Sequence, residues 1–255
     1  MLLYDTHAHL DDPKFDGDRD EVIEKIKNSP VGLVNNIGAD IKTSKASIAL
    51  AEKYDFIYAV CGIHPSETEN LLEEDMQTLY EMSKHKKVKA IGEIGLDYHY
   101  ENSPAKEIQR FWFERQLSLA KEVQLPVVIH DRESKGEGLE ILKKSGIKKG
   151  VVHCFSGSAE TAVELLKLGF YISFTGVVTF KNARKALEAL KSIPIERLFI
   201  ETDCPYMAPE PFRGTRNDST NVIKIAEKYA EIKNMSLEKI AEITTKNAKS
   251  FFGVN

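Results

Sequence analysis

Short apolar runs recur along the whole chain and alternate with amphipathic stretches. Each run is rich in valine and isoleucine and too short for a helix, which is typical of parallel strands covered on both faces. Eight runs predict strands at Leu2–Asp5, Gly32–Ile37, Ile57–Cys61, Val88–Gly92, Pro126–Ile129, Gly150–His153, Tyr171–Phe174 and Leu198–Glu201.

The stretches between these runs have apolar residues at helical spacing. Asp18–Asn28, for example, carries Val22, Ile23 and Ile26 on one side, as a helix packed on a sheet does. The same spacing predicts helices at Ala46–Tyr54, Leu71–Lys84, Ala105–Val123, Gly138–Lys144, Ala159–Leu168, Ala183–Lys191 and Val222–Ile232. One more helix, Leu237–Phe252, follows the last unit and has Ser236 as its N-cap.

Eight β-α units in one uninterrupted series predict an α/β protein, a (β/α)8 TIM barrel with an extra C-terminal helix. No Pro-, Gly- or Ser-rich linker divides the series, so we expect residues 1–255 to form a single domain. The alternative fold is a large open α/β sheet.

Composition narrows the class of protein. The net charge of −4 argues against a protein that coats nucleic acid by bulk electrostatics, because such binders need many Lys and Arg residues. Three scattered cysteines without a C-x-x-C pair predict buried free thiols in a reducing compartment. No signal peptide and no apolar run near the ~20 residues of a membrane span are visible. We therefore expect a cytoplasmic protein, a monomer without membrane contact.

Polar residues follow the predicted strands at the end where a TIM barrel carries its catalytic groups. Five of the seven histidines lie there. A single histidine at a strand end is more often structural, but several strands ending this way favour a metal site. The segments are Asp5-Thr6-His7-Ala8-His9, Gly62-Ile63-His64-Pro65, Gly92-Glu93-Ile94-Gly95-Leu96-Asp97-Tyr98, Ile129-His130-Asp131-Arg132, Val152-His153-Cys154-Phe155-Ser156-Gly157 and Glu201-Thr202-Asp203-Cys204-Pro205.

Two of these segments suggest ligands directly. His7 and His9 point to the same side of a strand, so two imidazoles can bind one metal ion, although a capped turn after a strand is the alternative. Glu93 lies in an apolar strand, where an unpaired carboxylate is costly to bury. Either a set of donors or a cation must meet it, and the histidines favour a metal, which the two oxygens could bridge.

The last strand adds two carboxylates. Asp203 should lie beside His7 and His9, because strand 8 of a barrel closes on strand 1. Glu201 is on the same side by alternation, and we expect it to orient a ligand as an outer-shell group. The mixed nitrogen and oxygen donors suit Zn, Mn, Co, Ni or Mg.

Together, these motifs resemble those of the TatD family of metal-dependent deoxyribonucleases, within the amidohydrolase-like barrels. They span nearly the whole chain in the expected order. The resemblance implies two divalent metal ions per chain. One would be held by His7, His9, Glu93 and Asp203, and the other by Glu93, His130 and His153, with Glu93 as the bridge.

Two segments depart from the family pattern. Arg213-Gly214-Thr215-Arg216-Asn217 match it, but Asp218-Ser219 replace the usual Glu-Pro. After Arg132, Glu133-Ser134-Lys135-Gly136 replace the usual Ala and Asp. Both segments are expected in substrate-facing loops, so they bear on substrate preference rather than on the metal site.

The resemblance implies an enzyme that hydrolyses phosphodiester bonds of DNA, as a 3′–5′ exonuclease on single-stranded ends. Asp203 is the expected general base toward the attacking water. His64, Arg132 and Arg213, with Arg216, are the candidate phosphate binders, with surface salt bridges as the alternative for the arginines. The alternative activity is a metal-dependent deacylase or esterase acting on a carboxylic ester or amide, such as D-aminoacyl-tRNA. A non-catalytic metal-binding scaffold is the third possibility.

Overall fold

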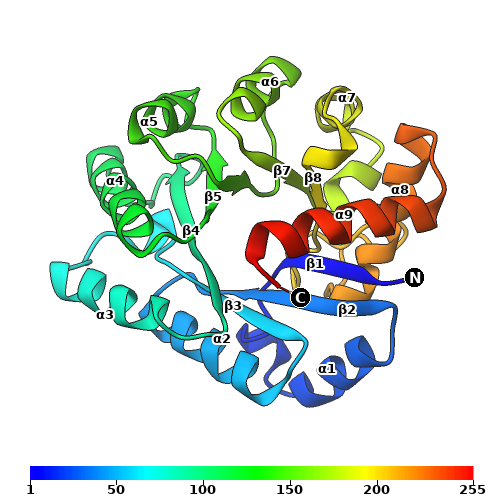
Figure 1. The fold of residues 1–255 in the computed structure, drawn as a ribbon, viewed down its shortest axis with the longest axis horizontal. Coiled ribbons are helices and arrows are strands. Elements are labelled where there is room, and N and C mark those ends of the chain that lie inside the picture. The colour runs from blue at the N-terminus through cyan, green and yellow to red at the C-terminus, as the bar shows by residue number, and fades with distance from the viewer. Residues whose placement is uncertain (255) are drawn as a thin grey trace.

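Eight parallel strands form one sheet in the order β1 to β8, with helices around it (Figure 1). The computed structural model describes residues 1–254. A bridge between Ala8 and Cys204 joins the first strand to the segment after the last, so the sheet curves into a barrel and the open-sheet alternative is wrong. The strands are β1 (Leu3–Ala8), β2 (Val31–Ile37), β3 (Ile57–Cys61), β4 (Val88–Asp97), β5 (Val127–Arg132), β6 (Gly150–Val152), β7 (Tyr171–Phe174) and β8 (Leu198–Ile200).

The helices pack their apolar faces on the outside of the barrel. They are α1 (Arg19–Lys27), α2 (Ile41–Lys53), α3 (Glu73–Ser83), α4 (Lys106–Val123), α5 (Glu137–Ser145), α6 (Ala159–Lys167), α7 (Arg184–Ser192), α8 (Val222–Lys233) and α9 (Leu237–Phe252). Among residues 1–254, no helix combines the length and the apolar character needed to cross a membrane. The three cysteines are free thiols; Cys61 and Cys204 are buried as predicted, whereas Cys154 is only half-buried, so the prediction is wrong there.

Two elements, β4 and α2, differ most from the prediction, while β1 and β5 each end three residues later than predicted. Strand β4 does not end at Gly92 but runs on to Asp97, because Ile94–Asp97 pair with Ile129–Arg132 of β5. Helix α2 begins at Ile41 rather than Ala46. Asp40 accepts a hydrogen bond from the Thr43 amide at 2.6 Å and donates its own amide to the Thr43 hydroxyl at 2.9 Å, a capping box that starts the helix early.

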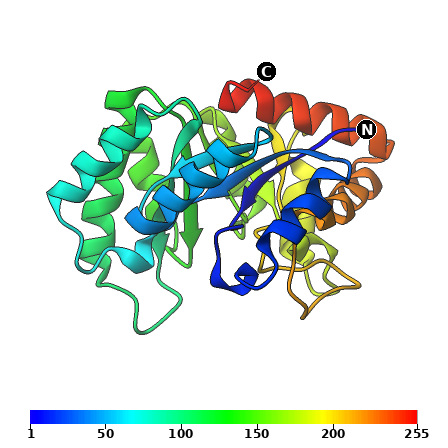
Figure 2. The same cartoon turned by 90° about the horizontal axis from the view of Figure 1, so that it is seen from below.

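The barrel interior has an apolar end and a polar end. At the amino ends of the strands, Tyr4, Val128 and Phe199 pack with α9, whose Phe251 and Phe252 rings lie 5.2 and 5.9 Å from the Phe199 ring. Figure 2 shows α9 along one side of the barrel and the loops at the carboxyl ends of the strands projecting from the other. The side chains of α9 thus close the amino end of the barrel. The opening at the carboxyl ends of the strands is called the mouth below, and the polar groups lie there.

Candidate metal centre

Two strands lead to a histidine next to the apolar floor: His130 lies within β5, and His153 directly follows β6. Val128 and Val151 belong to the apolar interior cluster, and His130 and His153 each follow two residues later. Because side chains alternate along a strand, both imidazoles enter the barrel on the side of those valines. The sequence pattern therefore positions these two donors directly.

Glu93 lies at the middle of the polar end and is only 4% exposed. Its Oε1 is 2.5 Å from Nε2 of His153 and 2.7 Å from Nδ1 of His130, whereas its Oε2 faces Nε2 of His7 at 3.4 Å. Burial alone would raise the pKa of Glu93, but the charges of His153 and His7 hold that pKa well below its usual range. One carboxylate thus faces two different sets of histidines with its two oxygens.

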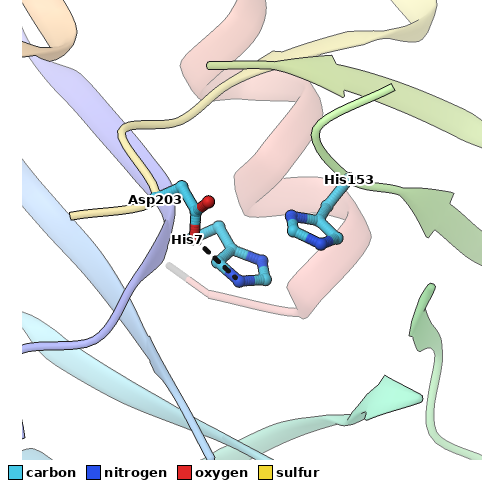
Figure 3. A group of neighbouring side chains, drawn as sticks. All are labelled: His7, His153 and Asp203. Atoms are coloured by element: carbon cyan, nitrogen blue, oxygen red, sulfur yellow. Dashed lines mark ion pairs between the residues drawn. The ribbon is translucent and has the colours of Figure 1, made fainter. Parts of the chain in front are cut away.

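Asp203 faces the other side of this group. Its Oδ1 lies 3.4 Å from Nε2 of His9 and 3.8 Å from Nε2 of His7, and the two Nε2 atoms are 3.3 Å apart. Figure 3 shows His7 between Asp203 and His153, with the two imidazoles face to face at 3.9 Å. The ring of His9 is oriented by the Ile37 carbonyl, which lies 2.9 Å from Nδ1 and accepts its proton, so the Nε2 lone pair faces the centre.

The residues present fit divalent metal ions. Four overlapping groups each have donor atoms within 4.8 Å of one another: His7, His9 and Glu93; His7, His153 and Asp203; Glu93, His130 and His153; and His64, Asp97 and His130. Imidazole nitrogens and carboxylate oxygens are donors for such ions. The Nδ1 atoms of His7 and His153 are buried without a hydrogen-bond partner among the described residues. The structure thus brings together all six predicted ligands.

The carboxylates of this group also stabilise positive charge on their neighbours. Burial lowers the pKa of an imidazole. Hydrogen bonds that the ring donates to Asp97 and Glu93 nevertheless raise the pKa of His130 to about 10, and Asp203 raises that of His9 to about 9. The carboxylates are therefore strong enough to draw cations into a buried position, where metal ions can take the place of those protons.

Asp97 is a site residue to which the sequence analysis gave no role. Its Oδ2 is 3.1 Å from Nε2 of His130, and its Oδ1 accepts a hydrogen bond from the His99 amide at 2.9 Å. A carboxylate on the far nitrogen fixes the ring, so that Nδ1 of His130 faces Glu93. The signal was the even spacing from Glu93 to Asp97, which becomes informative once β4 is known to extend through both residues.

Glu201 is buried close to His153. It accepts hydrogen bonds from the Cys154 amide at 2.6 Å and the Ser173 hydroxyl at 2.7 Å. Its Oε1 is 3.8 Å from Nδ1 of His153. Burial raises the pKa of Glu201 to about 7.

Asp203 is positioned by its loop and not by strand alternation, because β8 ends at Ile200. Its φ of +56° is a left-handed backbone conformation that is uncommon outside glycine. Asp5 accepts hydrogen bonds from the Thr202 amide at 2.9 Å and hydroxyl at 2.6 Å. On the other side, the amide of buried Asn217 donates to the carbonyls of Thr202 at 3.1 Å and Tyr206 at 2.7 Å. These bonds hold the loop around Asp203.

We expect Asn217→Ala to lower both stability and turnover. It leaves the Thr202 and Tyr206 carbonyls without their buried donor, which costs about 1–3 kcal/mol, and it releases the loop that fixes Asp203. Thermal unfolding and kcat of the metal-loaded protein are the measurements, with exposed Thr215→Ala in the same loop as the control. Unchanged kcat in a destabilised Asn217→Ala protein would remove Asn217 from the positioning role.

His64 presents a proton to the centre rather than a lone pair. Its Nδ1 accepts a hydrogen bond from the Ser66 amide at 3.1 Å, so a neutral ring carries its proton on Nε2, which lies 3.8 Å from Oε1 of Glu93. Burial and the neighbouring His130 lower the pKa of His64 to about 3, which keeps the ring neutral. This geometry suits a donor to substrate.

The three arginines of the predicted phosphate site differ. Arg132 and Arg213 form no salt bridge within residues 1–254. The alternative that they form surface salt bridges is therefore wrong for this part of the chain. Arg132 donates to the Tyr100 hydroxyl at 3.2 Å, and the guanidinium carbon of Arg213 lies 4.1 Å above the Phe180 ring. Arg216 instead forms a two-pronged pair with Asp18, at 2.8 and 2.5 Å. The expectation that Arg216 binds phosphate is therefore corrected: its guanidinium is held by Asp18.

The departure at Asp218-Ser219 is accommodated locally. Asp218 accepts a hydrogen bond from the Thr220 amide at 2.9 Å and caps a short 3-10 helix, Ser219–Asn221, while its other oxygen pairs with Lys25 at 2.5 Å. The departure thus leaves the adjoining Asn217 contacts in place.

The chain is similar to known proteins over almost its whole length. The family model described as TatD related DNase matches residues 4–253. A Bacillus subtilis (strain 168) protein, named uncharacterized metal-dependent hydrolase YabD, is 49% identical over the full length of both chains. The Escherichia coli (strain K12) protein named uncharacterized metal-dependent hydrolase YcfH is 34% identical, covering 100% of this chain and 97% of that one. The crystal structure of YjjV, a TatD homologue from E. coli K12, superposes with a TM-score of 0.93 at 31% identity, covering 99% and 98% of the two chains.

Proposed function

Because the chain belongs to the family of TatD-related DNases, we propose that it hydrolyses phosphodiester bonds of DNA, as a 3′–5′ exonuclease on single-stranded ends. The coarser assignment is firm: the protein is a metal-dependent hydrolase of this family. The observation that carries the proposal is the position of Glu93, whose two oxygens face two sets of histidines within one buried group.

In the proposed centre, His7, His9, Glu93 and Asp203 would hold one divalent ion, and Glu93, His130 and His153 would hold a second. Ions bound there supply Lewis acidity toward the phosphate and lower the pKa of a water from about 16 to about 7. Zn, Mn, Mg, Co and Ni all remain candidates, since the donor set is mixed nitrogen and oxygen.

The chain's own groups have separate tasks. Asp203 is ionised, because hydrogen bonding to His9 and the charge of His7 outweigh burial and lower its pKa; its carboxylate accepts the proton of the attacking water. Nε2–H of His64 donates to a phosphate oxygen. Arg132 and Arg213 offer planar forks of donors for the other oxygens. Asp97 holds the ring of His130 in place through a contact at 3.1 Å, and the Glu201 carboxylate lies 3.8 Å from the His153 ring.

A flexible strand end suits the site better than a duplex interior. The apolar floor closes the barrel at the amino end, so the scissile bond must enter a pit from the mouth. The net charge of −4 gives little general attraction for a long polyanion. Few phosphates are then neutralised, and each contributes a salt slope of about −0.7 for a single strand, so we expect a slope of about −1 to −3.

The test compares linear single-stranded DNA, blunt duplex, sealed single-stranded circles and an aminoacyl ester under matched metal and salt. We expect the linear single strand to be degraded fastest, from its 3′ end. Rapid cutting of the circle, or a steep salt slope, would instead mean an endonuclease with an extended groove. Turnover of the ester without cleavage of any DNA would move the assignment to the deacylase. The monomeric state and the cytoplasmic location stay predictions.

A further inference from the structure

Large aromatic side chains are exposed at the mouth, on the loops that follow β4 and β8. Tyr100 is 60% exposed and Phe212 is 42% exposed. Figure 2 shows both loops, the teal one after β4 and the orange one after β8, projecting from the side opposite α9. Strands β4 and β8 lie on opposite sides of the barrel, because the sheet runs in order from β1 to β8. Exposed rings at the mouth are free to contact a ligand.

An arginine lies near each exposed ring, over the ring itself for Tyr100 and next in the chain for Phe212. The guanidinium of Arg132 lies 5.1 Å from the Tyr100 ring centroid and donates to its hydroxyl, and strand alternation places Arg132 directly above His130. Across the mouth, Arg213 follows Phe212 in the chain and covers the half-buried Phe180 at 4.1 Å. An aromatic face beside a cation is the combination that binds unpaired nucleotides.

The third side of the mouth is unsuited to a polyanion. A cleft of about 660 Å³ lies beside Ser66, the residue that bonds to His64. Two lysines and four carboxylates line it, namely Lys42, Lys45, Asp40, Glu67, Glu69 and Asp75. This excess of negative charge repels phosphates. The DNA strand should therefore pass over the loops that carry Tyr100 and Phe212 instead.

We infer that Tyr100 with Arg132, and Phe212 with Arg213, are two stacking platforms for the unpaired nucleobases on either side of the scissile phosphate. This inference rests on the proposed hydrolysis of DNA and names how that substrate is held. The rings contact base faces, and the arginines contact the flanking phosphates. Every base has a π face, so the platforms accept any sequence while requiring that the bases be unstacked from a complement.

The experiment measures how strongly each variant prefers a short single-stranded oligonucleotide over two reference substrates. One reference is the same oligonucleotide with abasic residues at its 3′ end, and the other is methyl p-nitrophenyl phosphate, a small diester without a base. The variants are Tyr100→Ala and Phe212→Ala, with Tyr100→Phe and Phe212→Tyr as ring-preserving partners. Phe111→Ala is the matched control, since Phe111 is equally exposed, at 56%, but on helix α4.

We expect each alanine variant to lower the kcat/KM ratio of oligonucleotide to small diester by about 5- to 100-fold, the effect of losing one stacked base, mainly through KM. The ring-preserving variants and Phe111→Ala should keep the wild-type ratio. The alanine variants should hydrolyse the abasic strand as well as wild type does. Fluorescence anisotropy of a labelled oligonucleotide should show the same loss as a rise in Kd, independently of turnover.

Equal losses on the base-containing and abasic strands, or a ratio like that of Phe111→Ala, would overturn the platforms while leaving the nuclease assignment intact. Conversely, a protein that binds the oligonucleotide through Tyr100 and Phe212 but cleaves no DNA would support the platforms and overturn the proposed hydrolysis. A wild-type protein that neither binds nor cleaves the single strand would overturn both.

Discussion

Asp203→Asn is expected to lower kcat by about 10²–10⁴-fold, the usual contribution of a general base. Asparagine keeps the shape of the side chain and one oxygen near His9 and His7, while its amide cannot accept the proton of the attacking water. Turnover of single-stranded DNA, circular dichroism and metal content by elemental analysis are the measurements. Asp218→Asn, a carboxylate change in the same loop that lies outside the donor group, is the control.

Two outcomes of the Asp203→Asn experiment would contradict the role of Asp203 as general base. A loss smaller than about fivefold, at unchanged metal content, is too small for a general base and would assign that role to another group. A large loss accompanied by loss of metal would instead make Asp203 chiefly a ligand. The left-handed backbone at Asp203 is unchanged by the substitution, since asparagine also tolerates that conformation.

Glu93→Gln should remove at least one of the two proposed ions and lower turnover by more than about 100-fold, beyond the range seen when only an outer-shell partner is changed. The neutral amide cannot supply the charge that faces His130 and His153 on one side and His7 on the other. Metal content is the first readout. The second is thermal stability, because an ion bound only by the folded state raises it, by about 4 kcal/mol at 1,000 times Kd.

Wild type should therefore melt at a higher temperature when metal is added, and Glu93→Gln should show a much smaller rise. Glu133→Gln, an exposed carboxylate change on the same face, is the control and should behave like wild type. Full two-ion occupancy with wild-type turnover in Glu93→Gln would contradict the bridging role.

The positions of the strands were predictable because parallel strands are buried on both faces. Ile57–Cys61 and Tyr171–Phe174 match β3 and β7 at both ends. Strand β4 was cut short because a charged residue ordinarily ends an apolar run, whereas Glu93 points into a polar barrel interior. The start of α2 was missed because a capping box, and not apolar spacing, sets it.

The metal centre was predictable where an apolar residue of the barrel interior is followed two positions later by an imidazole, as for His130 and His153. It was less predictable where distant segments cooperate. Asp5 and Thr202 are 197 positions apart, and Asn217 reaches back to the same loop, so no local pattern reveals that they fix Asp203. The partner of Arg216 was missed for the same reason, since Asp18 lies 198 positions away.

Helix α9 has a kinetic consequence. Its Phe251 and Phe252 pack in the apolar cluster at the amino end of the barrel, so among the described residues the mouth is the route to the metal centre. In the proposed reaction, the end of the DNA strand enters through the mouth, and the nucleotide released from it must leave through the same mouth. A nucleoside monophosphate that lingers there blocks the next strand end, which makes product inhibition competitive. The next DNA end can bind only after each nucleotide has left. The DNA is therefore digested one nucleotide at a time, and digestion can stop after any of these steps.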